Sequence, residues 1–274
     1  MEALTKISRI KLLIPSILLG CVALLSYCGD ASDNRALVNI LLIDAPGDFD
    51  QVWIEIRGVE ILPQGTRGAE NANWIFFPYT PANKMVNVSE QVGESRLLLG
   101  RKEIHAGAVS KIRLLIGDEY YLLKNGARIP LNPVAGIEDY LEMDVEFNVP
   151  VGFAFDIYID FNLASSIISD GQGGFNLKPA LRAFTVAQTA TIRGTVLPNV
   201  ARPHIFAISE KDTFGTLTGP NGLFLLRGLP PGPYQVKIAA RPPYLDTAFM
   251  VNTLPDTVSQ LPNFNLRMNE EDSE

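Results

Sequence analysis

The stretch 218–236, TGPNGLFLLRGLPPGPYQV, carries the clearest structural signals in the chain. Asn221-Gly222 is a pair that tight β-hairpin turns prefer, because both central positions of such a turn take positive φ. Pro230-Pro231-Gly232 provides a rigid second turn. Apolar residues then alternate from Tyr234 to Ile238, as one buried face of a strand requires. The pattern predicts short strands joined by tight turns.

The surrounding segment repeats this pattern. We expect about seven strands in fewer than eighty residues: Ala190–Leu197, Pro203–Ser209, Thr213–Thr218, Leu223–Arg227, Pro233–Ala239, Thr247–Asn252 and Asn263–Arg267. The motif "turn-G-x-F-x-x-x-G-L-P-P-G-x-Y-x-V" within it resembles the carboxypeptidase-regulatory-like family over residues 189–267. That resemblance implies a transthyretin-like seven-stranded β-sandwich that serves as a non-catalytic accessory.

Upstream, residues 36–186 also read as period-two segments separated by Gly, Pro and Asn. The expected strands are Leu37–Ile43, Gln51–Ile61, Asn73–Phe77, Val109–Ile116, Tyr120–Lys124, Met143–Phe147 and Ala154–Phe161. Only Ser89–Leu99 is predicted as a helix, with Ser89 as its cap. The chain is therefore predicted to be all-β, with two antiparallel β-sandwich domains that separate near Thr185–Ala190.

Two of these strands can be divided into faces. In the first, Val52, Ile54 and Ile56 point inward, and the outward set is Gln51, Trp53, Glu55 and Arg57. The apolar positions then change parity at Val59 and Ile61, which predicts a β-bulge near Gly58. In the second, the expected core face is Phe153, Phe155, Ile157, Ile159 and Phe161, and the other face is Ala154, Asp156, Tyr158 and Asp160.

Motifs at both ends of this first region point to a known family. Leu42-Ile43-Asp44-Ala45-Pro46-Gly47-Asp48-Phe49-Asp50, followed by Val52-x-Ile54-x-Ile56-x-x-Val59, resembles the start of the bacterial envelope family named domain of unknown function 4382. Ile159-Asp160-Phe161 and Gly174-Phe175-x-Leu177-Lys178-Pro179-Ala180-Leu181-Arg182-Ala183 resemble its end. The resemblance covers about residues 36–185. It implies a lipoprotein whose family has no known activity.

The N-terminus predicts secretion. A basic leader with Lys6, Arg9 and Lys11 precedes an apolar run at 12–25, and a cysteine follows. The run is shorter than the ~20 residues that a spanning helix needs. We expect a signal peptide over 1–27, lipidation of Cys28 with a palmitate-type acyl chain, and a tether over 28–35. Leu18-Leu19-Gly20-Cys21 resembles the bacterial lipobox, so Cys21 is the alternative.

This leader places the protein in the cell envelope. We expect an outer-membrane lipoprotein, held to the membrane by its lipid anchor and either periplasmic or surface-exposed.

Charge and cysteine content exclude several functions. Removing residues 1–27, which carry Glu2 against three basic residues, takes the net charge from −7 to −9. Such a protein repels phosphate backbones, so nucleic-acid binding is not expected. With Cys28 acylated, no cysteine remains for a disulfide or a thiolate site. Residues 268–274 form an acidic tail that we expect to be frayed.

No catalytic constellation emerges from the sequence. The two histidines, His105 and His204, lie in different predicted domains, and no Gly-x-Ser-x-Gly motif accompanies them. We therefore expect a protein that is not an enzyme and has no cofactor. Asp44, Asp48 and Asp50 crowd one loop and are a weak candidate for Ca²⁺. The simpler interpretation is that Asp44 caps a turn while Asp48 and Asp50 are solvated.

Aromatic residues on polar strand faces are the remaining candidates. Trp53 lies beside Glu55 and Arg57, and Tyr158 lies on the polar face of another strand. An exposed ring among charged side chains can stack on a sugar or anchor a protein partner. The alternative is that a loop or the neighbouring domain covers Trp53.

The functional hypothesis follows from these residues. We expect a non-catalytic binding or adhesion module, with a glycan or an envelope protein as its partner. The alternative is a structural or assembly component of an envelope complex, in which the second domain is a spacer.

Overall fold

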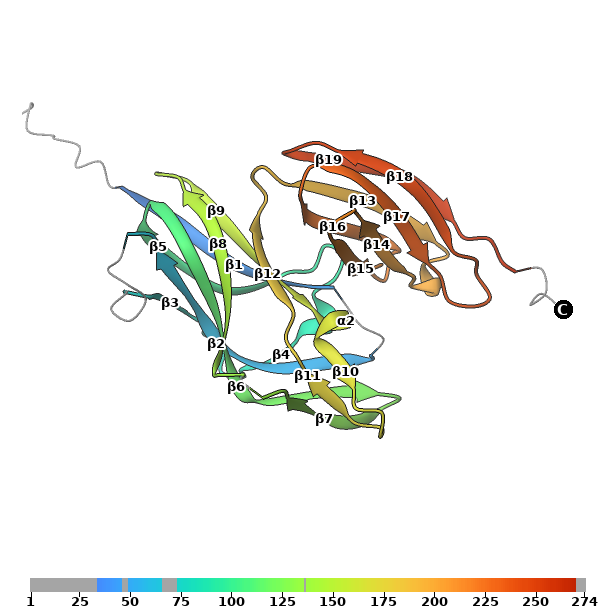
Figure 1. The fold of residues 1–274 in the computed structure, drawn as a ribbon, viewed down its shortest axis with the longest axis horizontal. Coiled ribbons are helices and arrows are strands. Elements are labelled where there is room, and N and C mark those ends of the chain that lie inside the picture. Colours follow the sequence, from blue (N-terminus) through green and yellow to red (C-terminus); the bar gives the residue numbers. More distant parts are fainter. Residues whose placement is uncertain (1–33, 46–48, 66–72, 136, 270–274) are drawn as a thin grey trace, which may run out of the picture. The chain divides into compact units, whose positions relative to one another are not determined.

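The computed structural model describes residues 34–45, 49–65, 73–135 and 137–269 (Figure 1). Within these ranges the chain is all-β, and α2 (Leu163–Ser166) is its one α-helical turn. None of the helices described is long and apolar enough to cross a membrane. The predicted leader with Cys21 and Cys28 lies outside the described residues.

Residues 35–185 form two sheets that we call the N-terminal sandwich. The first sheet has the order β12-β9-β1-β5, and the second has the order β10-β11-β7-β6-β2-β3, with β4 on β2 and β8 on β6. The strands are β1 (Arg35–Ala45), β2 (Gln51–Pro63), β3 (Ile75–Pro78), β4 (Met85–Asn87), β5 (Leu97–His105), β6 (Gly107–Lys124), β7 (Ala127–Pro133), β8 (Tyr140–Val149), β9 (Ala154–Asn162), β10 (Ile167–Ser169), β11 (Phe175–Leu177) and β12 (Leu181–Thr185).

Residues 190–265 form two further sheets, the C-terminal sandwich. One has the order β16-β13-β19 and the other β15-β14-β17-β18. The seven strands are β13 (Ala190–Leu197), β14 (His204–Ile208), β15 (Thr213–Leu217), β16 (Leu223–Leu229), β17 (Gly232–Ala239), β18 (Thr247–Thr253) and β19 (Thr257–Asn265). Pairing is mostly antiparallel, but β1–β9, β7–β11 and β13–β19 are parallel.

Each sandwich has its own apolar core. Val52, Ile54 and Ile56 of β2 are fully buried in the first, as their alternation predicts. Tyr234, Val236 and Ile238 of β17 are buried in the second. A small third cluster, Leu41, Ile43, Tyr158 and Phe184, lies on the opposite face of the β12-β9-β1-β5 sheet. Residues from Arg35 onward form one compact unit.

The predicted bulge in β2 is confirmed. Register shifts occur on both sides of Ile56, and Val59 and Ile61 return to the core. A β-carbon at Gly58 would lie 2.5 Å from the carbonyl oxygen of Phe77, so only glycine lets β3 approach so closely. The two strands expected at 109–116 and 120–124 are one strand, β6, with its own irregularity opposite this site.

The predicted helix at 89–99 is wrong. Only Val88–Glu90 forms a 3₁₀ turn, and Leu97–Leu99 begin β5, which pairs with β1. Leu99 is buried in the core while Leu98 is 45% exposed, which is the alternation of a strand. Pairing across the sheet outweighs the local helical propensity of this leucine-rich segment.

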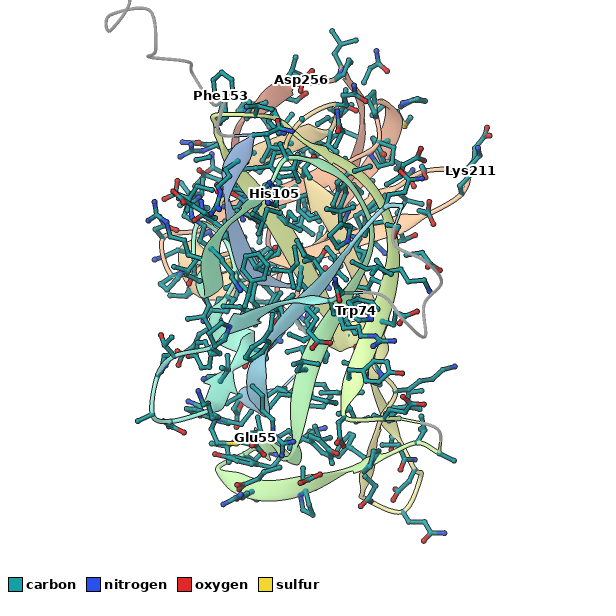
Figure 2. All side chains as sticks on the ribbon, turned by 90° about the vertical axis from the view of Figure 1, so that its left-hand side faces the viewer. Glu55, Trp74, His105, Phe153, Lys211 and Asp256 are labelled. Carbon is teal, nitrogen blue, oxygen red and sulfur yellow. The ribbon has the colours of Figure 1, made fainter. Side chains whose placement is uncertain are left out.

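Three finer expectations also need correction. Phe153 precedes β9 and is 70% exposed, so it is not a core residue (Figure 2). The turn at Asn221-Gly222 is not a hairpin, because it joins β15 and β16, which belong to different sheets. The expected tail begins later, because Met268 forms a β-bridge with Tyr244; its last five residues lie outside the described ranges.

Candidate functional site

The outer face of β2, β6 and β7 carries a row of aromatic and cationic side chains. Trp53 on β2 stands opposite Tyr121 on β6, and their rings stack with centroids 6.1 Å apart and planes at 15°. The Arg128 guanidinium carbon lies 3.8 Å from the centre of the Tyr121 ring. We call Trp53, Tyr121 and Arg128 the aromatic surface. The pairing of the strands brings these three side chains together from β2, β6 and the start of β7.

Hydrogen bonds fix the orientation of this surface. The Trp53 indole Nε1 donates to Gln51 Oε1 at 2.9 Å, and Arg128 forms an ion pair with Glu119. Both rings are half-buried, so part of each stays accessible to a ligand. An ordered ring flanked by charged groups can stack on the apolar face of a sugar and bind its hydroxyls.

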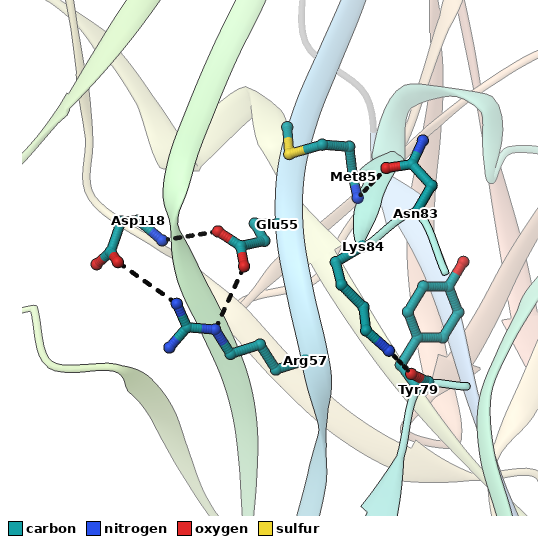
Figure 3. A network of polar contacts seen from close by, with 7 residues as sticks. All are labelled: Glu55, Arg57, Tyr79, Asn83, Lys84, Met85 and Asp118. Carbon is teal, nitrogen blue, oxygen red and sulfur yellow. Dashed lines mark hydrogen bonds and ion pairs between the residues drawn. The ribbon is translucent and has the colours of Figure 1, made fainter. Parts of the chain in front are cut away.

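Glu55 and Arg57 lie on the same face but bind one another and the neighbouring strand (Figure 3). Arg57 Nε donates to Glu55 Oε1 at 3.3 Å, and Glu55 Oε2 accepts from the backbone N–H of Asp118 at 3.0 Å. A β-carbon at Gly117 would overlap the Glu55 carboxyl, so Gly117 provides the space for it. These two candidates therefore hold the irregular part of β6 in place.

Tyr158 is not part of an exposed surface, contrary to the sequence-based expectation. Its side chain is buried at 4% exposure, and its ring stacks on Phe184 at 5.3 Å. The polar face of β9 is thus covered. Pattern alone could not reveal this, because the ring that covers Tyr158 comes from β12.

Arg182 on β12 links the two sandwiches. Its Nε donates to Asp160 Oδ2 at 2.9 Å, and its two terminal nitrogens donate to the carbonyl oxygens of Gly228 and Arg227 at 2.7 and 2.8 Å. The guanidinium carbon also lies 4.7 Å from the Phe184 ring centre and 4.6 Å from that of Phe214. Charge-assisted bonds to two carbonyls make this a specific contact.

The acidic loop gives no calcium site among the described residues. Asp44 is buried, Asp50 is exposed and accepts from the Gly126 N–H at 3.4 Å, and Asp48 lies outside the described ranges. No group of three metal-ligating side chains occurs within those ranges. Asp44 lies near the end of β1, as expected, and the turn at Pro46-Gly47 that it was expected to cap lies outside the described residues.

Burial dominates the chemistry of Asp44 and Asp160. It raises the pKa of Asp44 well above the usual range, the Asp160 carboxylate raises it further, and the nearby Leu163 backbone N–H lowers it in part. Burial also raises the pKa of Asp160, against the lowering effect of Arg182. Among the described residues, neither Asp44 oxygen nor Asp160 Oδ1 has a hydrogen-bond partner.

The histidines do not meet at a reactive site. His105 is exposed at the end of β5, whereas His204 begins β14 and stacks on Phe206 at 6.1 Å. The second tryptophan, Trp74, is also occupied, because the Arg113 guanidinium lies 3.9 Å from its ring and 4.1 Å from that of Tyr140. Trp74 is therefore less available for a ligand than Trp53.

Sequence reasoning missed Tyr121, Arg128 and Arg182. Tyr121 belongs to an expected strand, but its partner across the sheet follows from register. Arg128 lies in β7, which was not expected at all. Arg182 lies within the end motif of the first region. It stands opposite Asp160 because β12 pairs with β9, and these two opposite charges were the available signal in the sequence.

Fold and surface together define an all-β, sandwich-type protein with an ordered aromatic surface. The family described as Domain of unknown function (DUF4382) matches residues 35–179. The chain belongs to this family.

Comparison with other proteins adds little to the family assignment. No curated protein matches the sequence. Among solved structures, the Bacillus anthracis TIE protein is similar at 9% identity and a TM-score of 0.24, over 85% of this chain and 34% of that one. A leucine-rich repeat protein from Bacteroides thetaiotaomicron has 12% identity and a TM-score of 0.20, over 86% and 26%. BcpA, the major pilin subunit of Bacillus cereus, has 10% identity and a TM-score of 0.25, over 86% and 100%.

The chain thus spans about a third of the length of the TIE protein and about a quarter of that of the leucine-rich repeat protein. Likeness at this level says nothing about activity or partners.

Proposed function

We propose that this protein is an envelope lipoprotein that acts as a non-catalytic binding or adhesion module, with the aromatic surface as its glycan-binding site. The observation that carries the proposal is the Trp53–Tyr121 stack with Arg128 over its end. These rings are held by cross-strand pairing and hydrogen bonds, so little ordering entropy is lost when a ligand binds. Sugars offer an apolar ring face and hydroxyls, which match the rings and the charged groups beside them.

The anchor is proposed from the leader. A lipid on Cys28 would tether the chain to the outer membrane and leave the sandwiches free to meet a partner. The intact mass of protein extracted from membranes decides this point. We expect an acylated chain that begins at Cys28. An acylated chain that begins at Cys21, or an unmodified form in wild-type cells, would contradict the assignment.

We also propose that residues 189–267 are a carboxypeptidase-regulatory-like domain. Its quoted motif and the seven strands β13–β19 in two sheets support this assignment. Such modules are commonly accessory, which agrees with a supporting role for the C-terminal sandwich.

Binding can be tested with the native protein and a panel of sugars and envelope extracts, with the melting temperature as readout. A ligand at one hundred times its dissociation constant stabilises the fold by about 2.7 kcal/mol. Trp53→Ala should then lower the affinity at least tenfold, or about 1.4 kcal/mol. Its cost in stability should be about 1 kcal/mol, the worth of an aromatic pair.

Trp74→Phe is the matched control, because Trp74 already contacts Arg113. This variant should bind normally. It also leaves Trp53 as the sole tryptophan, so its fluorescence reports the surface directly. A loss on the order of 3 kcal/mol in Trp53→Ala would indicate a packing residue instead. A blue, quencher-resistant emission from Trp53 would point the same way.

A structural or assembly role is the second candidate, and the Arg182 contact favours it. Arg182 bonds to the backbone carbonyls of Arg227 and Gly228 in the C-terminal sandwich, which supports a role for this sandwich as a spacer. If no sugar or Ca²⁺ shifts the melting temperature but an envelope extract yields a co-purifying protein whose binding survives Trp53→Ala, this role is preferred.

A further inference from the structure

Strand β18 ends a sheet without a neighbour on one side. It is last in the order β15-β14-β17-β18 and pairs only with β17, from Gly232 opposite Thr253 to Ile238 opposite Thr247 (Figure 1). Within the described part of the chain no strand pairs along its other side. Every second backbone N–H and C=O of this seven-residue strand therefore faces outward. Such an edge is a template for another strand.

The other edge strands of the two sandwiches are protected. β5 carries Arg101, Lys102 and Glu103, and β8 carries Glu142, Asp144 and Glu146. Proline ends β3 and interrupts β19, and β15 and β16 each contain a glycine, which weakens a strand. β4 and β10 have three residues each, and β12 is covered through Arg182 and Phe184. Charge, proline and shortness are the usual means by which an edge avoids pairing.

β18 has none of these features. Its sequence, TAFMVNT over Thr247–Thr253, contains no charge, proline or glycine. Phe249 and Val251 point toward the core, whereas Met250 lies on the outer face and is 68% exposed. An uncharged edge with a large exposed apolar side chain at its centre is suited to strand pairing.

We propose that β18 pairs antiparallel with β18 of a second copy of this chain, about a two-fold axis at Met250. The strand is self-complementary in this register. Phe249 stands opposite the partner's Val251, Thr247 opposite the partner's Thr253, and Met250 opposite the partner's Met250. Aromatic–β-branched pairs are favourable cross-strand neighbours, whereas the Thr253 hydroxyl is already bonded to Gly232 within its own sheet. The two four-stranded sheets then continue into one another.

The flanking charges are compatible with this arrangement. β18 contains no charged residue, so no like charges oppose one another within the paired strands, and Asp246 and Asp256 lie beyond the ends of the strand. Asp246 also keeps its own ion pair with Lys237 at 3.0 Å. A two-fold contact of this kind is isologous and closes as a dimer. Because one strand pair is a small interface, we expect a weak, concentration-dependent dimer.

Cysteine cross-linking of the full-length protein in bacterial membranes tests the register. Met250→Cys should give a covalent dimer under mild oxidation, because residue 250 meets its own copy at the axis, within reach of a disulfide. Ala248→Cys alone should cross-link at least tenfold less, since its opposite position is 252. Co-expression of Ala248→Cys with Asn252→Cys should restore the dimer.

Charge repulsion provides the second arm. Met250→Lys places two like charges at the axis and should raise the dissociation constant at least tenfold in sedimentation of the detergent-extracted protein. Val258→Lys, at an exposed position of β19, is the matched control and should leave association unchanged. Unaltered melting temperatures show that both variants fold.

Two results would overturn the proposal. One is a Met250→Cys protein that reacts with maleimide yet forms no dimer on oxidation. The other is a cross-linked product whose mass is not twice that of the chain, which would mean that a different protein occupies the edge.

Discussion

The ring of Phe184 rests directly on the backbone of Gly228, so that a β-carbon at residue 228 would lie closer than 3.0 Å to the ring. Phe184 belongs to β12 of the N-terminal sandwich and Gly228 to β16 of the C-terminal one. Arg182, two residues earlier on β12, donates to the carbonyl oxygen of the same glycine. One glycine therefore permits both the aromatic contact and the hydrogen bond that join the sandwiches.

Gly228→Ala should be more destabilising than an ordinary substitution at positive φ. The residue has φ +64°, which costs about 1 kcal/mol for a side chain, and the Phe184 ring blocks the methyl group in addition. Thermal unfolding measures the difference against Gly126→Ala, where φ is +75° and the space is open. Adding Phe184→Leu to Gly228→Ala should recover part of the loss. Equal costs at both glycines would contradict the tight contact.

Residues 189–268 should fold when produced alone. Their core is separate from that of the N-terminal sandwich and has its own buried set. At ~80 residues the fragment should be only marginally stable, since small domains bury a smaller share of their surface. It also loses the Arg182 contacts to Arg227 and Gly228. A cooperative melt with dispersed amide resonances is expected; their absence would mean that the two sandwiches fold as one unit.

Gly222→Val should destabilise the C-terminal sandwich by more than about 1 kcal/mol. Gly222 has φ +78°, and a β-carbon there would collide with the carbonyl oxygen of Val196. Gly152→Val is the matched control, because it has φ +77° with open space around it. The gap between the two melting temperatures isolates the collision. If Gly152→Val lowers the melting temperature by the same amount, backbone strain at positive φ is the whole cause of the loss.

Asp44→Asn should stabilise the protein at neutral pH and flatten its pH dependence. Burial raises the folded-state pKa of Asp44, so the folded state binds its proton more tightly than the unfolded state does. This contribution is complete below the unfolded pKa of about 3.9 and is lost as pH rises through the folded pKa. Each pKa unit by which the folded state exceeds the unfolded state amounts to about 1.4 kcal/mol of unfolding free energy.

Denaturant unfolding between pH 4 and pH 8 measures this effect. The difference in unfolding free energy between Asp44→Asn and the unsubstituted protein should grow as pH rises. Asp50→Asn, the same substitution at an exposed aspartate, is measured beside it as the matched variant. A difference that stays constant with pH would show that Asp44 is ionised throughout.

The sequence by itself determined the all-β class, most of the strands and the inward faces of β2 and β17. Period-two alternation is a local property, and a residue such as Ile54 must point to the core whichever strand lies beside it. The bulge at Gly58 was readable for the same reason, since a single extra residue shifts every later apolar position. The Asn221-Gly222 turn was located correctly, although the strands that it joins lie in different sheets.

Only the tertiary structure decided which polar strand faces are covered. Trp53 and Tyr158 share the same sequence signal, an aromatic ring among charged or polar neighbours. Yet Trp53 is half-buried against Tyr121, while Tyr158 is buried against Phe184. Trp53 meets a residue more than sixty positions away on β6, and Tyr158 meets Phe184 of the neighbouring strand β12. Register and packing between sheets depend on the sum of many distant contacts, and no single strand's pattern contains them.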